Sequence, residues 1–82
     1  MTIYSEQVGE LVAIGAAIAA NCEPCLKYHY DKARNLGVSL QDMRSAVETA
    51  QRVKDSPARK MLELAGRLLG GLESDQTILP GK

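Results

Sequence analysis

The stretch LVAIGAAIAANCEPCLKYH, residues 11–29, decides how this chain folds, because an uncharged run leads directly into a Cys-Glu-Pro-Cys segment. Residues 11–20 are apolar on all sides of a helical wheel, so we expect a first helix that is buried on every side. Ser5 is a suitable N-cap for this helix. The run is half the length needed to span a bilayer, which excludes a transmembrane helix there.

A second helix is predicted to start at the cysteines and to run to Leu36. Asn21 is the expected N-cap, and Pro24 is tolerated because a first-turn N–H has no partner within the helix. Gly37 is expected to end the helix in a left-handed conformation. The chain should reverse near residues 20 and 21. The first two helices are therefore predicted to form a central antiparallel hairpin.

Two further helices are predicted after residue 38. Ser39 and Asp42 resemble a capping box, and the third helix should run to about Lys54. Its predicted buried positions are Leu40, Met43, Val47, Ala50 and Val53. Ser56-Pro57 is typical of a new helix start, so we expect a fourth helix that ends at Gly70-Gly71. Residues 73–82 lack a helical period and should be mobile or docked on a neighbour. The sequence thus predicts a single compact all-α domain over residues 1–82.

The composition of the chain argues against two classes of binding partner, nucleic acids and anionic membranes. The 82 residues carry ten basic and ten acidic side chains and neither Trp nor Phe. A neutral chain without these stacking groups is not expected to bind nucleic acid or an anionic membrane. The N-terminus lacks the basic region of a signal peptide, which favours a cytoplasmic protein.

The short length also bears on assembly. A monomer of this size buries too little surface to be more than marginally stable. We therefore expect a homo-oligomer, with Leu11, Ile14 and Ile18 near the subunit contacts.

The only two cysteines and the only histidine fall on one face of the second helix. Cys22, Cys25 and His29 lie within about 60° of one another at about 100° per residue. Across the predicted hairpin, Glu10 is about as far from the turn as His29, at about 15 and 13 Å. The carboxylate can therefore lie beside the imidazole. The expected order is an orienting acid, a base and two thiols, and this order is typical of a site with an activated nucleophile.

A zinc site is the main alternative. Cys22, Cys25 and His29 supply three ligands, and Glu10 or a neighbouring subunit could supply the fourth. The chain would then be a non-enzymatic, zinc-stabilised helical assembly module. Simple burial of the cysteines and a surface role for His29 also remain open. A thioredoxin fold is excluded, because it needs a strand before the active-site helix and none is predicted.

The string Glu-x11-Cys-x2-Cys-x3-His resembles the signature of the AhpD-like alkylhydroperoxidase core, within the carboxymuconolactone decarboxylase superfamily. The resemblance covers about residues 11–53. It implies an all-helical fold that assembles into trimers or hexamers. It also implies that Cys25 attacks a hydroperoxide, and that Cys22 donates a proton and then resolves the product to a disulfide. His29 and Glu10 would form the proton relay.

The same resemblance implies the partners. The electron donor would be a dithiol such as dihydrolipoamide or a thioredoxin-like protein, since no nucleotide or flavin fingerprint is present and no cofactor or metal is expected. Pro24 stands where better-known members carry a second histidine, which predicts a shorter relay. Relatives that decarboxylate lactones lack the cysteine pair, so that activity is disfavoured. We expect a thiol-dependent hydroperoxide reductase.

Overall fold

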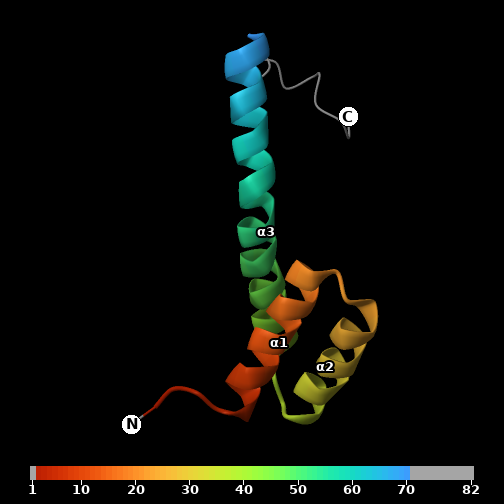
Figure 1. The fold of residues 1–82 in the computed structure, drawn as a ribbon. Helices are drawn as coiled ribbons and strands as arrows, with labels where there is room; N and C mark the ends of the chain where they lie inside the picture. Colours follow the sequence, from red (N-terminus) through yellow and green to blue (C-terminus); the bar gives the residue numbers. More distant parts are fainter. Residues whose placement is uncertain (1, 71–82) are drawn as a thin grey trace.

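The chain folds into three α-helices and connecting turns, as a computed structural model that describes residues 2–70 shows (Figure 1). The helices are α1 (Glu6–Ala20), α2 (Glu23–Asn35) and α3 (Leu40–Leu69). No strand occurs within these described residues. The expectation of an all-helical fold is therefore confirmed. The tail predicted for residues 73–82 lies outside the described part of the chain.

The turn between α1 and α2 differs from the sequence prediction in its caps. Ser5 is the N-cap of α1 as expected, and its Oγ accepts a hydrogen bond from the N–H of Val8 at 3.1 Å. Asn21 does not start α2; it ends α1 in the left-handed conformation, with φ at 56°. The N-cap of α2 is Cys22. Asparagine tolerates the left-handed region better than most residues, which suits it to a helix end as well as to a helix start.

The core lies where α1 meets the other two helices. After the turn the chain doubles back, so that α2 runs beside α1, and α3 packs on another side of α1 (Figure 1). The buried apolar cluster is formed by Ile14, Ala33, Val38 and Met43. Gly37 has a φ of 83°, the left-handed stop that the sequence predicted after α2. These contacts fix the α1–α2 pair that carries all four candidate site residues.

The third helix is longer than predicted. It runs without a break through Pro57 to Leu69, so the predicted end near Lys54 and the separate fourth helix are wrong. A proline removes one hydrogen bond from a helix and bends or weakens it, but it does not always end the helix. We call residues 57–69 the distal half of α3. It extends away from α1 and α2 (Figure 1).

The distal half makes the molecule elongated. The radius of gyration is 17.1 Å, whereas a compact domain of this length has about 12 Å. The expectation of a compact domain is therefore wrong for the single chain. The physical cause is the unbroken α3, which carries its second half out of reach of the core.

Burial along the helices also departs from expectation. The prediction that α1 is buried on every side is wrong, because Val12 in the middle of α1 is 56% exposed. Ile14 is 1% exposed inside the chain's own core, and the subunit contacts expected near it stay a prediction. Met43 is buried as predicted, but Leu40 and Val53 are exposed. The apolar pattern of α1 and α3 is thus wider than the surface that a single chain can cover.

Among the described helices, none is both long and apolar enough to cross a membrane.

Pro57→Ala is expected to stabilise the protein. Proline is about 3 kcal/mol less favourable than alanine inside a helix, so the free energy of unfolding should rise by about 1–3 kcal/mol. Thermal unfolding followed by circular dichroism measures the change, and Ser56→Ala at the neighbouring position serves as the control. An unchanged melting temperature in Pro57→Ala would show that α3 passes through the proline without cost.

Candidate functional site

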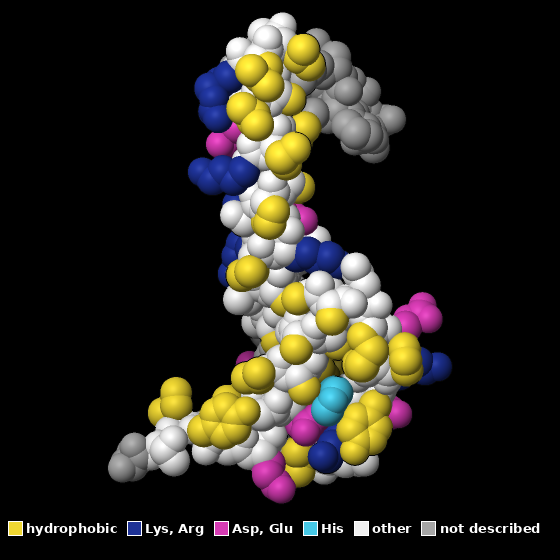
Figure 2. All heavy atoms as spheres, viewed as in Figure 1, with side chains coloured by type: hydrophobic (Ala, Val, Ile, Leu, Met, Phe, Trp, Pro, Cys, Tyr) yellow, Lys and Arg dark blue, Asp and Glu magenta, His cyan; other side chains and the backbone are white. Residues whose placement is uncertain are grey.

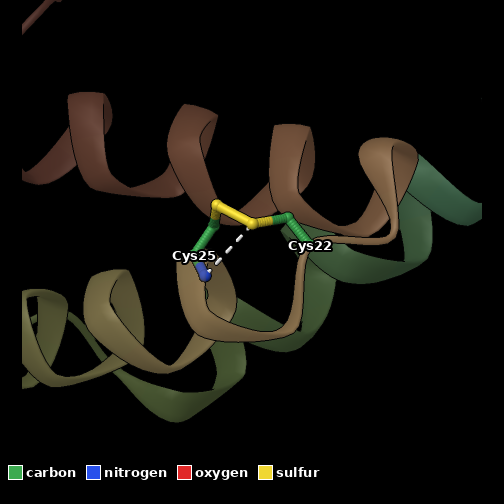
Figure 3. Close-up of a disulfide and its surroundings, with 2 residues drawn as sticks. All are labelled: Cys22 and Cys25. Carbon is green, nitrogen blue, oxygen red and sulfur yellow. Dashed lines mark hydrogen bonds between the residues drawn. A yellow bond between two sulfur atoms is a disulfide. The ribbon is translucent and has the colours of Figure 1, made fainter.

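Cys22 and Cys25 form a disulfide at the start of α2 (Figure 3). Their Cα atoms are 5.2 Å apart, within the usual range for a disulfide. Cys22 is the N-cap, and its Sγ accepts a hydrogen bond from the N–H of Cys25 at 3.3 Å. One sulfur therefore takes the place that a serine or aspartate oxygen takes in most helix caps. The spacing predicted from the sequence brings the two thiols into bonding distance.

The two sulfur-bearing residues differ in exposure. Cys25 is exposed, whereas Cys22 is half-buried beside Ile18 and Lys54 in a surface hollow at the α1–α2 turn. Cys22 is therefore the less accessible of the two residues. Its place at the helix end brings it against α1 and α3, while Cys25 lies one turn further along α2.

Glu10 and His29 meet across α1 and α2, as the sequence predicted. The Nδ1 atom of His29 lies 2.6 Å from Oε1 of Glu10. The Glu10 side chain is largely buried, and Nζ of Lys32 lies 3.7 Å from its other oxygen. A buried carboxylate is stable only when it has such partners. The histidine ring is partly exposed, and the single histidine of the chain reaches the surface in Figure 2.

The hydrogen bond to Glu10 fixes which ring nitrogen of His29 can act as a base. An ionised carboxylate only accepts, so the proton in this bond belongs to Nδ1. The Nε2 atom is then the one that can take up a proton from another group. The Tyr28 ring packs edge-on against the imidazole, with ring centres 4.9 Å apart. Glu10 therefore orients the ring, which is the role expected of an acid behind a general base.

The structure thus forms two pairs from the four predicted residues. One is the disulfide of Cys22 and Cys25, and the other is the contact of Glu10 with His29. Within residues 2–70, no hydrogen bond joins His29 to either cysteine. Cys25 and His29 are four positions apart on α2, a spacing that places residues on the same helix face.

This arrangement does not provide the cluster of ligands that the alternative of a zinc site requires. Zinc binds cysteine as the thiolate, and here both sulfurs are joined to each other. Across residues 2–70, no group of three or more Cys, His, Asp or Glu side chains lies where it could hold a metal ion.

Two lysines belong to the site and were missed in the sequence. Lys32 is three positions after His29, so its place beside Glu10 could have been found from helix periodicity. Lys54 comes from α3, and its Nζ donates to the carbonyl of Ile18 at 3.1 Å and to Oδ1 of Asn21. It thereby caps the end of α1 next to Cys22. No local sequence signal points to this contact, because the partners are more than thirty positions apart.

Comparison with known proteins gives one match. A family model described as "Carboxymuconolactone decarboxylase family" matches residues 5–65, which include all four site residues and most of the three helices. No curated protein matches the chain. No solved structure matches it either.

Proposed function

The chain belongs to the carboxymuconolactone decarboxylase family, and we propose that it is a dithiol oxidoreductase that reduces hydroperoxides. The family includes AhpD-like enzymes as well as decarboxylases. The observation that carries the proposal is the Cys22–Cys25 disulfide at the start of α2. A pair of thiols that can close to a disulfide within one helical turn can release two electrons without a cofactor. The match therefore supports the resemblance on which the sequence interpretation rested.

The oxidative half of the proposed reaction begins at Cys25. Its thiolate attacks one oxygen of the hydroperoxide, so that an S–O bond forms and the O–O bond breaks. The alkoxide leaves and takes a proton from the thiol of Cys22. Cys25 is then a sulfenic acid. The exposure of Cys25 supports this assignment, because the peroxide must reach the sulfur.

The second step closes the disulfide. The Cys22 thiolate attacks the Cys25 sulfur, the S–S bond forms, and the sulfenic oxygen leaves as water after it gains a proton. In sum, one hydroperoxide and two thiols give one alcohol, one water and one disulfide. An external dithiol then returns two electrons and two protons and becomes a disulfide itself. Dihydrolipoamide and a thioredoxin-like protein are donors of this class.

Glu10 and His29 would supply the proton steps. In the reduced protein the free Nε2 of His29 would take the proton from Cys25, directly or through water, while the carboxylate of Glu10 stabilises the resulting imidazolium. The 2.6 Å contact and the burial of Glu10 support this role. Burial in particular makes the carboxylate a stronger partner than it would be in water.

Glu10→Gln and His29→Ala are expected to slow alkylation of Cys25 at neutral pH by roughly tenfold to a hundredfold. Both changes weaken proton removal, and the thiolate is the form that reacts. The measurement is the rate of iodoacetamide reaction against pH, in a Cys22→Ser background that leaves Cys25 as the only thiol. The half-maximal rate should move to higher pH in both variants.

Lys27→Gln is the matched control, because it removes a charge from an exposed position of the same helix. It should leave the profile almost unchanged. Superimposable profiles for Glu10→Gln, His29→Ala and the parent protein would show that the two residues only hold α1 to α2.

The direct test of the proposed function is a thiol count. Reduced protein should lose two thiols per chain when one equivalent of cumene hydroperoxide is added, and dihydrolipoamide should restore both. Oxidation of the protein no faster than that of a free cysteine would argue against peroxide as the substrate. In that case disulfide exchange with a second dithiol would remain as the activity to measure.

A further inference from the structure

Lys54 joins α3 to the turn between α1 and α2. Its Nζ atom donates a hydrogen bond to the carbonyl of Ile18 at 3.1 Å and another to Oδ1 of Asn21. Asn21 directly precedes Cys22, and the N–H of Cys22 donates to the carbonyl of Ala17 at 3.0 Å. In Figure 1, α3 passes beside the end of α1 that these bonds hold. Lys54 is therefore bonded to the same turn that carries the Cys22 sulfur.

The two hydrogen bonds also fix the position of the Lys54 charge. A lysine ammonium on a protein surface usually extends into water, where its charge is screened. Lys54 is instead half-buried, and its ammonium is held by two neutral oxygens that do not cancel the charge. An ammonium has three N–H donors. Within residues 2–70 Lys54 uses two of them, so one is left for a further acceptor.

Lys54 and Cys22 line the same surface hollow at the α1–α2 turn. The charged residues around this hollow are Lys54 from α3 and Glu23 from α2, whereas α1 contributes the uncharged Ala17 and Ile18. Glu23 is exposed, so water screens its charge more than that of half-buried Lys54. The start of α2 adds the positive end of a helix dipole. The field at Cys22 therefore favours a negative sulfur.

The residues that serve Cys25 lie elsewhere. Glu10 and His29 line a second hollow, between the first half of α1 and the later part of α2. Cys25 is one turn before His29 on the same face of α2. The two cysteines thus have different neighbours, an imidazole for Cys25 and an ammonium for Cys22.

We propose that Lys54 is a positioning residue that stabilises the thiolate of Cys22, so that Cys22 is the sulfur that carries negative charge when the disulfide opens and closes. The inference rests on the proposed dithiol chemistry. In the oxidised protein, a thiolate of the external dithiol attacks exposed Cys25. A bond forms between the two sulfurs, the S–S bond to Cys22 breaks, and its electron pair stays on Cys22 beside Lys54.

The remaining steps return both thiols. The second thiol of the donor gives up its proton and attacks the donor sulfur that is bound to Cys25. The donor becomes a disulfide, Cys25 leaves as a thiolate, and the two protein thiolates take up the two protons that the donor released. In the oxidative direction Cys22 gives its proton to the departing alkoxide and then attacks Cys25 as a thiolate. Both directions pass through the anion that Lys54 stabilises.

The test is the rate of Cys22 alkylation by iodoacetamide against pH, in a Cys25→Ser background that leaves Cys22 as the only thiol. Lys54→Met and Lys54→Gln remove the charge, and each should lower the rate at pH 7 by about threefold to tenfold and move the half-maximal rate to higher pH. Lys54→Arg keeps the charge and should stay close to the parent protein. Lys60→Met is the matched control on an exposed position of α3 and should leave the profile unchanged.

Asn21→Gly separates the charge of Lys54 from its hold on the turn. Glycine adopts the left-handed conformation of residue 21 without cost. The variant loses the Oδ1 acceptor but keeps the Lys54 charge, so it should change the Cys22 profile less than Lys54→Met does. Equal changes in the two variants would show that Lys54 only holds the turn, which would overturn the proposal. An unchanged profile in Lys54→Met and Lys54→Gln would overturn it as well.

Cys25 provides the second readout. In a Cys22→Ser background Lys54→Met should leave the alkylation profile of Cys25 almost unchanged, and equal slowing of both cysteines would contradict a specific action on Cys22. Circular dichroism checks that each variant is helical. The measurement uses no peroxide, so the two proposals can fail separately. If cumene hydroperoxide removed no thiols while Cys22 alkylation depended on Lys54, the proposed function would fail and the role of Lys54 would stand.

Discussion

Cys25→Ser should abolish the reaction with organic hydroperoxide, whereas Cys22→Ser should stop the reaction after its first step. In the Cys22→Ser variant the attacking sulfur remains and the resolving thiol is gone, so a sulfenic acid should accumulate on Cys25. Dimedone labelling followed by mass spectrometry detects that product. Cys25→Ser should show neither the sulfenic acid nor a disulfide, and its remaining thiol should react no faster than free cysteine.

The two variants are controls for each other, because each retains one thiol at the start of the same helix. Equal dimedone labelling of both would mean that the two sulfurs exchange roles. Labelling of Cys22 alone, in Cys25→Ser, would reverse the assignment. That result would fit the N-cap position of Cys22, where the N–H of Cys25 can stabilise a negative sulfur.

Ile14→Ala should cost about 2–5 kcal/mol of folding free energy. Ile14 is the largest fully buried side chain described, and it lies between α2 and α3 on the one helix that contacts both. A loss of this size is comparable to the whole stability of a small domain. Far-UV circular dichroism at 25 °C should therefore show a largely unfolded protein, or one that melts far below wild type.

Val12→Ala is the matched control for Ile14→Ala. It removes a similar apolar group from the same helix at a position that is 56% exposed. Its cost should be below about 1 kcal/mol, since little surface leaves water there on folding. Equal destabilisation by both substitutions would mean that the uncovered side of α1 is buried in an assembly.

Local signals in the sequence predicted much of the fold and of the candidate site. Ser5, Ser39 and Gly37 act as predicted, because caps and stops depend on a few neighbouring residues. The contact between Glu10 and His29 also follows from local rules, since it needs only two helix lengths and a reversal at the turn.

The errors arose where two local signals compete or where a contact is distant. Asn21 suits both the end of one helix and the start of the next, and only the packed turn selects the first role. At Pro57 the sequence carries a start signal, Ser followed by Pro, but a proline can also lie inside a helix, and α3 runs through it. The bond from Lys54 to the end of α1 joins residues far apart in sequence, which no pattern of spacing can reveal.

The hydrogen bond from the Cys25 amide to the Cys22 sulfur has a practical consequence for spectroscopy. Pro24, directly before Cys25, has no amide proton. The donor to the Cys22 sulfur is the Cys25 N–H. Its acceptor is the atom that changes bonding partner when the disulfide opens. The ¹⁵N–¹H resonance of Cys25 should therefore move on reduction. It would report the oxidation state of the protein during a titration, with no attached probe and no change of sequence.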